Sequence, residues 1–151
     1  MALHASWIHG NALTVEDPSA LEGDGHYGWG RDLAFVPGKA SWLHIPLPTP
    51  VIVADKRTMV QRFFLLFKAE SCEIRDVHIY DGSGKVQEIS GLHAEGEHRT
   101  ILDGMNTFDL AAAHTVAFGM GITFRVQAAI GFDTRITTRF ILASAGADFS
   151  A

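Results

Sequence analysis

Three histidines each stand two residues away from a large aromatic residue, in segments that have the pattern of β-strands. The pairs are Trp7 with His9, Trp42 with His44, and His78 with Tyr80. In an extended strand, residues i and i+2 point to the same face, so each pair presents a flat ring beside a titratable nitrogen. If the three segments share one sheet face or line one cavity, they form a polar and aromatic surface suited to a sugar, another small organic ligand or a metal ion.

A second group of candidate residues lies in the glycine-rich stretch 17–30. The segment 23–28 fits the pattern G-x-G-x-x-G, but no apolar strand leads into it and no helix follows, so we do not expect a dinucleotide site. The stretch is predicted to be a long loop, and loops of this length are often functional. It carries His26, Tyr27 and Trp29, which would close over a bound ligand.

The histidines also suggest a metal centre. Three neutral imidazoles with an open coordination position, supplied by His9, His44 and His78, would suit a divalent transition metal such as zinc, copper or iron. On a jelly roll this arrangement would point to a metal-dependent, cupin-like enzyme. The chain lacks the His-x-His pair of that family, however, and its nearest cluster is predicted to be a solvated loop. That cluster contains His93, Glu95, Glu97 and His98.

The elements that position these residues are predicted from a period-two pattern. The clearest case is 116–132, where apolar residues alternate with small or polar ones, and 136–142 continues the pattern as an antiparallel neighbour after a short turn. The turn 81–84 makes 73–89 a hairpin. Only 106–114 combines good helix formers with capping residues and could form a short helix. Other predicted strands are 3–9, 13–16, 33–36, 41–47, 51–53 and 59–68.

This pattern predicts one all-β domain spanning 1–151. Many short strands without βαβ alternation favour a two-layer antiparallel β-sandwich, jelly-roll-like, with at most one short helix. A closed antiparallel β-barrel is the alternative. The stretch 63–67 is apolar on both strand faces, so one face must be covered, either by the short helical segment and a loop or by a second copy of the chain, and we expect the second, a homo-oligomer.

Composition and charge narrow the possible binding partners and the cellular location. The net charge is −5 and the Lys and Arg residues are scattered, so a nucleic-acid partner is not expected. No apolar stretch has the roughly 20 residues of a membrane span. The start 1–5 lacks the features of a signal peptide, which predicts a cytoplasmic protein. The single cysteine, Cys72, is expected to be a small buried hydrophobic residue.

Three functions are compatible with these residues. The first is a lectin-like binding protein that holds a carbohydrate or a small organic ligand on its His-aromatic face. The second is the metal-dependent enzyme described above, and the third is a structural or self-assembling protein. Motifs of the types G-x-S-x-G, H-E-x-x-H, Walker and C-x-x-C are absent, so no catalytic residue is assigned and the sequence leaves open whether the protein is an enzyme.

Overall fold

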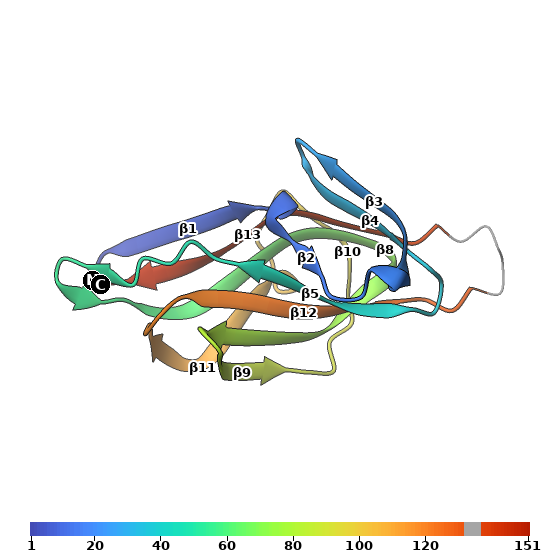
Figure 1. Cartoon of the computed structure of the whole chain (residues 1–151). Coiled ribbons are helices and arrows are strands. Elements are labelled where there is room, and N and C mark those ends of the chain that lie inside the picture. Colours follow the sequence, from blue (N-terminus) through green and yellow to red (C-terminus); the bar gives the residue numbers. More distant parts are fainter. Residues whose placement is uncertain (132–136) are drawn as a thin grey trace.

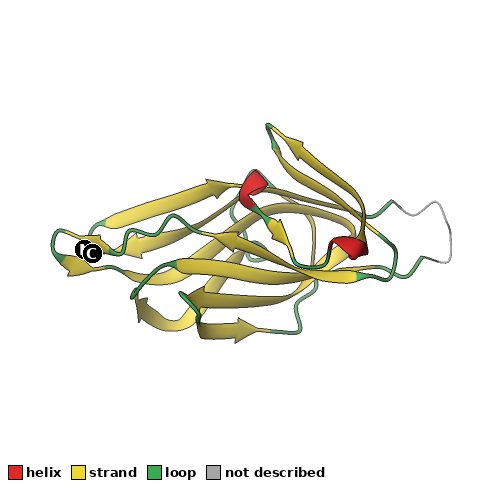
Figure 2. Cartoon of the chain, viewed as in Figure 1, coloured by secondary structure: helices red, strands yellow, loops and turns green. Residues whose placement is uncertain are grey.

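The structure, a computed structural model, describes residues 1–131 and 137–151 and is built almost entirely of strands (Figures 1 and 2). Its described part contains no α-helix and only two short 3-10 helical turns, η1 and η2, at Gly10–Ala12 and Pro18–Ala20. The strands are β1 Leu3–His9, β2 Thr14–Val15, β3 Leu21–Tyr27, β4 Gly30–Phe35, β5 Ala40–Pro46, β6 Ile52–Val53, β7 Lys56–Arg57, β8 Met59–Asp81, β9 Gly84–Ile89, β10 Ala94–His98, β11 Thr107–Thr115, β12 Met120–Ala128 and β13 Arg139–Ser150.

All of these strands except β6 and β7, which pair with each other, form a curled antiparallel sheet that folds into the predicted sandwich. The main order is β2-β5-β12-β8-β13-β4-β3, with β1 on β13 and with β9, β10 and β11 on β8. Within the described chain the two end strands of this path, β2 and β3, do not pair with each other, so the sheet is not the closed barrel of the alternative prediction. The all-β sandwich prediction is confirmed.

Strand β8 joins the two layers. Its residues 59–70 pair with β13 and its residues 72–81 pair with β12, and the change occurs at Ser71, whose φ of 55° lies in the left-handed region. A change of backbone direction at one residue lets a 23-residue strand serve both layers. The hairpin predicted for 73–89 is confirmed, because β8 pairs with β9.

The core lies between the layers and is dominated by phenylalanine. Phe124 of β12 and Phe140 of β13 face each other with ring centroids 5.8 Å apart, and Phe67 stacks on Phe140 at 5.9 Å. The prediction that 136–142 is the antiparallel neighbour of 116–132 is therefore wrong. Strands β12 and β13 do not pair with each other, because β8 lies between them. Their alternating apolar rows meet face to face across the core, and period-two patterning identifies the buried face of a strand but not its partner.

Two local predictions are wrong. The helix predicted at 106–114 is strand β11, because Phe108 and Leu110 alternate into the core and this packing outweighs the helix propensity of the alanines that follow. The loop predicted at 17–30 is largely strand β3, paired with β4. Position 25 within β3 is a glycine, because a Cβ there would overlap the ring of Tyr27.

The apolar stretch 63–67 is covered by the chain itself. Phe63, Leu65 and Phe67 are fully buried in the core, and the ring of Trp7 stacks on Phe64 with centroids 5.3 Å apart. The stretch therefore needs no second copy, and the homo-oligomer stays a prediction without this support. Among the residues described, no helical segment has the length and hydropathy required to cross a membrane.

Candidate functional site

The outer face of β5, β12 and β8 carries the candidate site. Three rows of paired residues cross it: Pro46–Gly121–Tyr80, His44–Thr123–His78 and Trp42–Arg125–Asp76. The residues between them on β12, Ile122 and Phe124, point into the core and are buried. The strict alternation of β12 therefore presents Gly121, Thr123 and Arg125 to the outside, between the two His-aromatic pairs on its neighbours.

The aromatic and imidazole rings of these pairs lie close together. The ring centroids of Trp42 and His78 are 4.7 Å apart with planes at 42°, and those of His78 and Tyr80 are 6.5 Å apart at 51°. Tilted rings leave much of each ring face uncovered. In the part of the chain that is described, neither the His78 imidazole nor the Tyr80 hydroxyl makes a hydrogen bond to another protein group, so both are free to bind a ligand.

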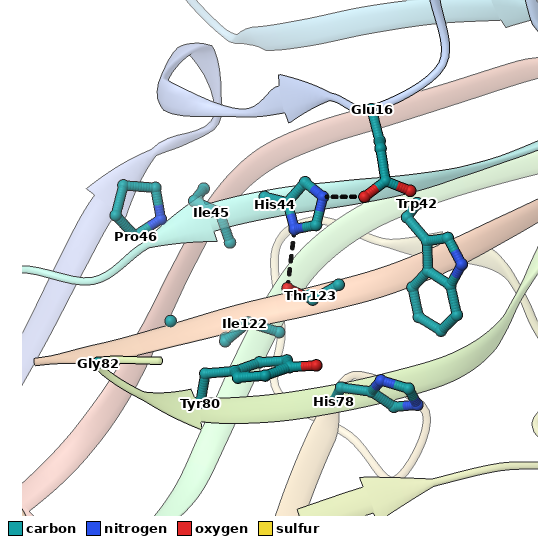
Figure 3. A pocket seen from close by; sticks show the side chains of 11 residues that line it. Glu16, Trp42, His44, Ile45, Pro46, His78, Tyr80, Gly82, Ile122 and Thr123 are labelled. Atoms are coloured by element: carbon teal, nitrogen blue, oxygen red, sulfur yellow. Dashed lines mark hydrogen bonds and ion pairs between the residues drawn. The ribbon is translucent and has the colours of Figure 1, made fainter. Parts of the chain in front are cut away.

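His44 occupies the centre of a short polar network. Its Nδ1 lies 2.9 Å from Oγ1 of Thr123 and its Nε2 lies 3.1 Å from Oε1 of Glu16, which follows β2 (Figure 3). Because an ionised carboxylate only accepts hydrogen bonds, the proton is on Nε2, and in a neutral imidazole Nδ1 accepts from the Thr123 hydroxyl. Both protons are used within the network, so the groups it fixes beside the rings are acceptors, the Thr123 hydroxyl oxygen and the second carboxylate oxygen of Glu16.

A groove of about 640 Å³ lies over this face. We define it by Trp42, His44, His78, Tyr80, Gly121 and Thr123, with Glu16 and Gly82 at its rim. Its volume falls within the range of small-ligand sites, and its lining combines apolar rings with a few polar groups. Gly121 keeps it open, since a Cβ there would stand 3.8 Å from the nearest atom, the carbonyl oxygen of Ile45, and would point into free space.

The charged side chains beside the groove are mutually paired. Arg125 Nε donates to Oδ2 of Asp76 at 2.8 Å, and Lys85 binds Glu88 on β9. The contact with Lys85 holds the pKa of Glu88 below its usual value. Among the described residues of this face, Arg125 and Lys85 thus each contact a carboxylate, and the Glu16 carboxylate contacts the His44 imidazole.

A buried carboxylate holds the loop next to the groove. Asp81 accepts hydrogen bonds from the backbone N–H groups of Ala117, Phe118 and Gly119 at 2.7, 2.9 and 3.0 Å, and from His114 Nε2 at 2.7 Å. Burial acts to raise the pKa of Asp81, but these four donors outweigh it and hold the pKa far below its usual range. These bonds fix the loop 116–119 between β11 and β12. The side chain of Phe118 projects from this loop, and the residue is 78% exposed.

The third His-aromatic pair lies elsewhere. Trp7 covers Phe64 from β1, a strand that pairs with β13 and not with β5 or β8. His9 is a structural cap: its Nδ1 accepts from the N–H of Asn11 at 3.1 Å and its Nε2 lies 2.8 Å from the carbonyl oxygen of Gly28. The structure thus brings together two of the three predicted pairs.

The predicted lid residues do not line the groove either. The β3–β4 hairpin projects from the top of the molecule in Figure 1, with Tyr27 and Trp29 stacked at 4.7 Å near its tip. Arg139 lies over the Trp29 ring at 5.8 Å, and Tyr27 covers Gly25, so the chain itself contacts both rings. His26 is exposed, with Nε2 3.8 Å from Oδ1 of Asp24.

The metal-site prediction is corrected by the same placement. His9 lies on β1, whereas His44 and His78 lie on β5 and β8, and His44 is already bonded through both ring nitrogens. Across residues 1–131 and 137–151, no group of three or more His, Cys, Asp or Glu side chains is close enough to hold a metal ion. The three histidines predicted as metal ligands, His9, His44 and His78, therefore do not form one site, and the hypothesis of a metal-dependent enzyme loses this support.

Several site residues were missed by sequence reasoning. Glu16, Thr123 and Arg125 have no motif that identifies them, because their role depends on which strands are neighbours. Thr123 and Arg125 did stand on the polar face of the alternating pattern, which was the available signal. Asp81 was recognised as a turn residue but not as the anchor of the loop that carries Phe118.

Comparison with known proteins gives a family and a fold. Residues 1–150 match the model described as "Family of unknown function (DUF6623)". No curated protein matches the chain. Among solved structures, a low affinity xylan binding module, CBM86, from Roseburia intestinalis is similar with a TM-score of 0.55 and 13% identity, over 97% of this chain and 96% of the module. That similarity shows a shared fold.

Two further solved structures are similar at lower scores. TmCBM61, solved in complex with β-1,4-galactotriose, has a TM-score of 0.39 and 15% identity, over 99% of this chain and 88% of its own. A family 35 carbohydrate binding module from Clostridium thermocellum has a TM-score of 0.35 and 11% identity, over 91% and 97%.

Proposed function

We propose that this chain, which belongs to the family of unknown function DUF6623, is a carbohydrate-binding protein that holds a glycan in the groove on β5, β12 and β8. The observation that carries the proposal is the contact between the Trp42 and His78 rings beside the Thr123–His44–Glu16 network. A sugar ring has apolar C–H faces and a hydroxyl rim, and this groove offers ring faces next to fixed hydrogen-bonding groups.

The groups on this face match the needs of such a ligand. Free nitrogens on His78 and the Tyr80 hydroxyl can donate to or accept from sugar hydroxyls, and the second oxygen of Glu16 can accept. Trp42 is half-buried at its base by the sheet, so little side-chain entropy is lost when a ligand packs on it. Binding requires no movement of the strands, since the groove is already open.

The similarity in fold suggests which ligands to test first. The CBM86 module is described as binding xylan, and we extend only that class of ligand, plant-type polysaccharides with uncharged sugars, to this chain as a proposal. A cytoplasmic location also stays a prediction, which cell fractionation would test.

The proposal is tested by affinity electrophoresis in gels that contain xylan, β-1,4-galactan, β-glucan or mannan. We expect retarded migration in at least one gel, and we expect Trp42→Ala to abolish it. Trp29→Ala is the matched control, because it also removes an indole, but from the β3–β4 hairpin and not from the groove. Normal migration of the wild type in every gel, or equal retardation of the Trp42→Ala variant, would overturn the proposal.

A further inference from the structure

We infer that the groove binds an extended, uncharged polysaccharide chain that runs from Trp42 across β12 to Tyr80 and continues over Gly82 to Phe118. The inference rests on the proposed function and deepens it, because it names the class of glycan, the path of the chain and an additional aromatic contact. Phe118 does not line the groove itself, and nothing in the sequence pattern marks it as a binding residue.

The groove has no wall at the end near the β8–β9 turn. Gly82 forms that end, it is exposed, and its φ of 59° lies in the left-handed region that favours glycine. Pro46, on the opposite side of Gly121, is exposed as well. Because Gly82 has no side chain of its own, a ligand that occupies the space over Gly121 can extend beyond the groove in the direction of Gly82, against which the Phe118 ring packs.

Phe118 stands where such a ligand would leave the groove. Its ring packs against Gly82, since a Cβ on Gly82 would lie 3.2 Å from Cδ2 of Phe118. The loop is tied to the turn by the N–H of Gly82, which donates to the carbonyl oxygen of Gly119 at 2.8 Å, and by the Asp81 carboxylate. An exposed aromatic ring on a backbone fixed by several hydrogen bonds is preorganised for contact with a ligand.

The rings form a series and not a cage. Trp42 lies on β5, His78 and Tyr80 lie two residues apart on β8, and Phe118 precedes β12, so the rings are spread over two strands and a loop. A single sugar unit contacts one or two rings of such a series. A chain of several units contacts all of them, and its affinity rises with length because each added contact is made within the same complex.

The pairing of charges selects against acidic glycans. Asp76 and Glu88 already offset the charges of Arg125 and Lys85 beside the groove, and the Glu16 carboxylate would repel a uronate or sulfate group. Neutral sugars need only hydrogen bonds and ring contacts, both of which the face provides.

The test compares oligosaccharides of different length by isothermal titration calorimetry. The probes are xylo-oligosaccharides and β-1,4-galacto-oligosaccharides of one to six units, with oligogalacturonides of matched length as the acidic counterpart. We expect the Kd of a neutral series to fall as units are added and then level off, and the acidic series to bind at least about tenfold more weakly. Phe118→Ala should weaken binding of the longest oligomers about three- to tenfold and leave the shortest binding ligand unchanged.

Ile101→Ala is the control for Phe118→Ala, because it removes another large exposed apolar side chain, from the loop between β10 and β11. Affinity that does not depend on length, a Phe118→Ala variant that binds long oligomers as tightly as the wild type, or a preference for oligogalacturonides would overturn the inference while the proposed function stands. Absence of binding to every oligosaccharide and to the polysaccharide gels would overturn the proposed function as well.

Discussion

The ring centroids of Trp42 and His78 lie 4.7 Å apart although the two residues belong to strands that are separated by β12. The contact exists because both side chains lean over the polar face of β12, where Thr123, the neighbour of His78, is small. The face therefore depends on three strands at once. It joins aromatic rings and hydrogen-bonding groups into one surface.

Gly121→Val should block the groove without damage to the fold. The nearest atom to a Cβ at this position is 3.8 Å away, φ lies outside the left-handed region, and a β-branched residue favours a strand. We expect binding to fall at least about tenfold and the melting temperature to stay within a few degrees. Gly28→Val, on the β3–β4 turn with nothing within 4 Å, is the matched control. Unchanged glycan affinity in Gly121→Val would place the ligand elsewhere.

Asp81→Asn should cost about 2–3 kcal/mol at pH 7, because the buried carboxylate accepts three backbone N–H bonds and one from His114. The pKa of Asp81 is depressed in the folded state. Its stabilising contribution is therefore present above the unfolded pKa of about 4 and is lost as the pH falls below it.

Urea unfolding measured between pH 7 and pH 3 checks this prediction. The free energy of unfolding of the wild type should fall towards low pH more steeply than that of Asp81→Asn, so the two curves converge. Parallel curves would show that the Asp81 carboxylate does not provide this stability. The variant should also lose part of its affinity for long oligosaccharides, since Asp81 is the positioning residue for Phe118.

Asn106→Ala should destabilise the protein by about 2–3 kcal/mol. The fully buried amide of Asn106 donates to the carbonyl oxygens of His98 and Ile101, at 3.1 and 2.7 Å, and accepts from the N–H of Asp103 at 2.8 Å. Removal of this amide takes away one hydrogen-bond partner from each of these three backbone groups. Thermal unfolding measures the loss, and a change below about 0.5 kcal/mol would contradict this account of the 98–106 loop.

Cys72 should react slowly with thiol reagents in the folded protein. Burial raises the pKa of its thiol to about 12, so almost no thiolate is present at pH 8. We expect labelling with Ellman's reagent to be slow in buffer and fast after unfolding in urea. Fast labelling of the native protein at pH 8 would show that this part of β8 opens.

The fold class was predictable because period-two patterning is a local property. The alternation of apolar with small or polar residues along β12 predicts which of its residues are buried. The turn at 81–84 is predictable from its own Asp and Gly residues. Pairing is not local, which explains why β12 and β13 were predicted as neighbours although Phe124 and Phe140 meet across the core. The helix predicted at 106–114 failed for a related reason, since packing of Phe108 outweighed intrinsic propensity.

The candidate site was predictable in part for the same reason. The i, i+2 rule placed Trp42 beside His44 and His78 beside Tyr80, but it gave no means to tell these pairs from Trp7 and His9. The difference between them is which strands are adjacent. Phe64, which Trp7 covers, lies 57 positions away in the sequence, and a single sequence does not identify such a partner.

The most direct test of the central claim is a nitrogen-15 NMR titration of the three tryptophan indole N–H signals with the polysaccharide-derived oligosaccharide that the gels identify. The account predicts a large shift or broadening of the Trp42 signal, with the signals of Trp7 and Trp29 unchanged. A titration that saturates while the Trp42 signal stays fixed, or that moves the Trp29 signal instead, would contradict the assignment of the β5–β12–β8 face as the glycan-binding site.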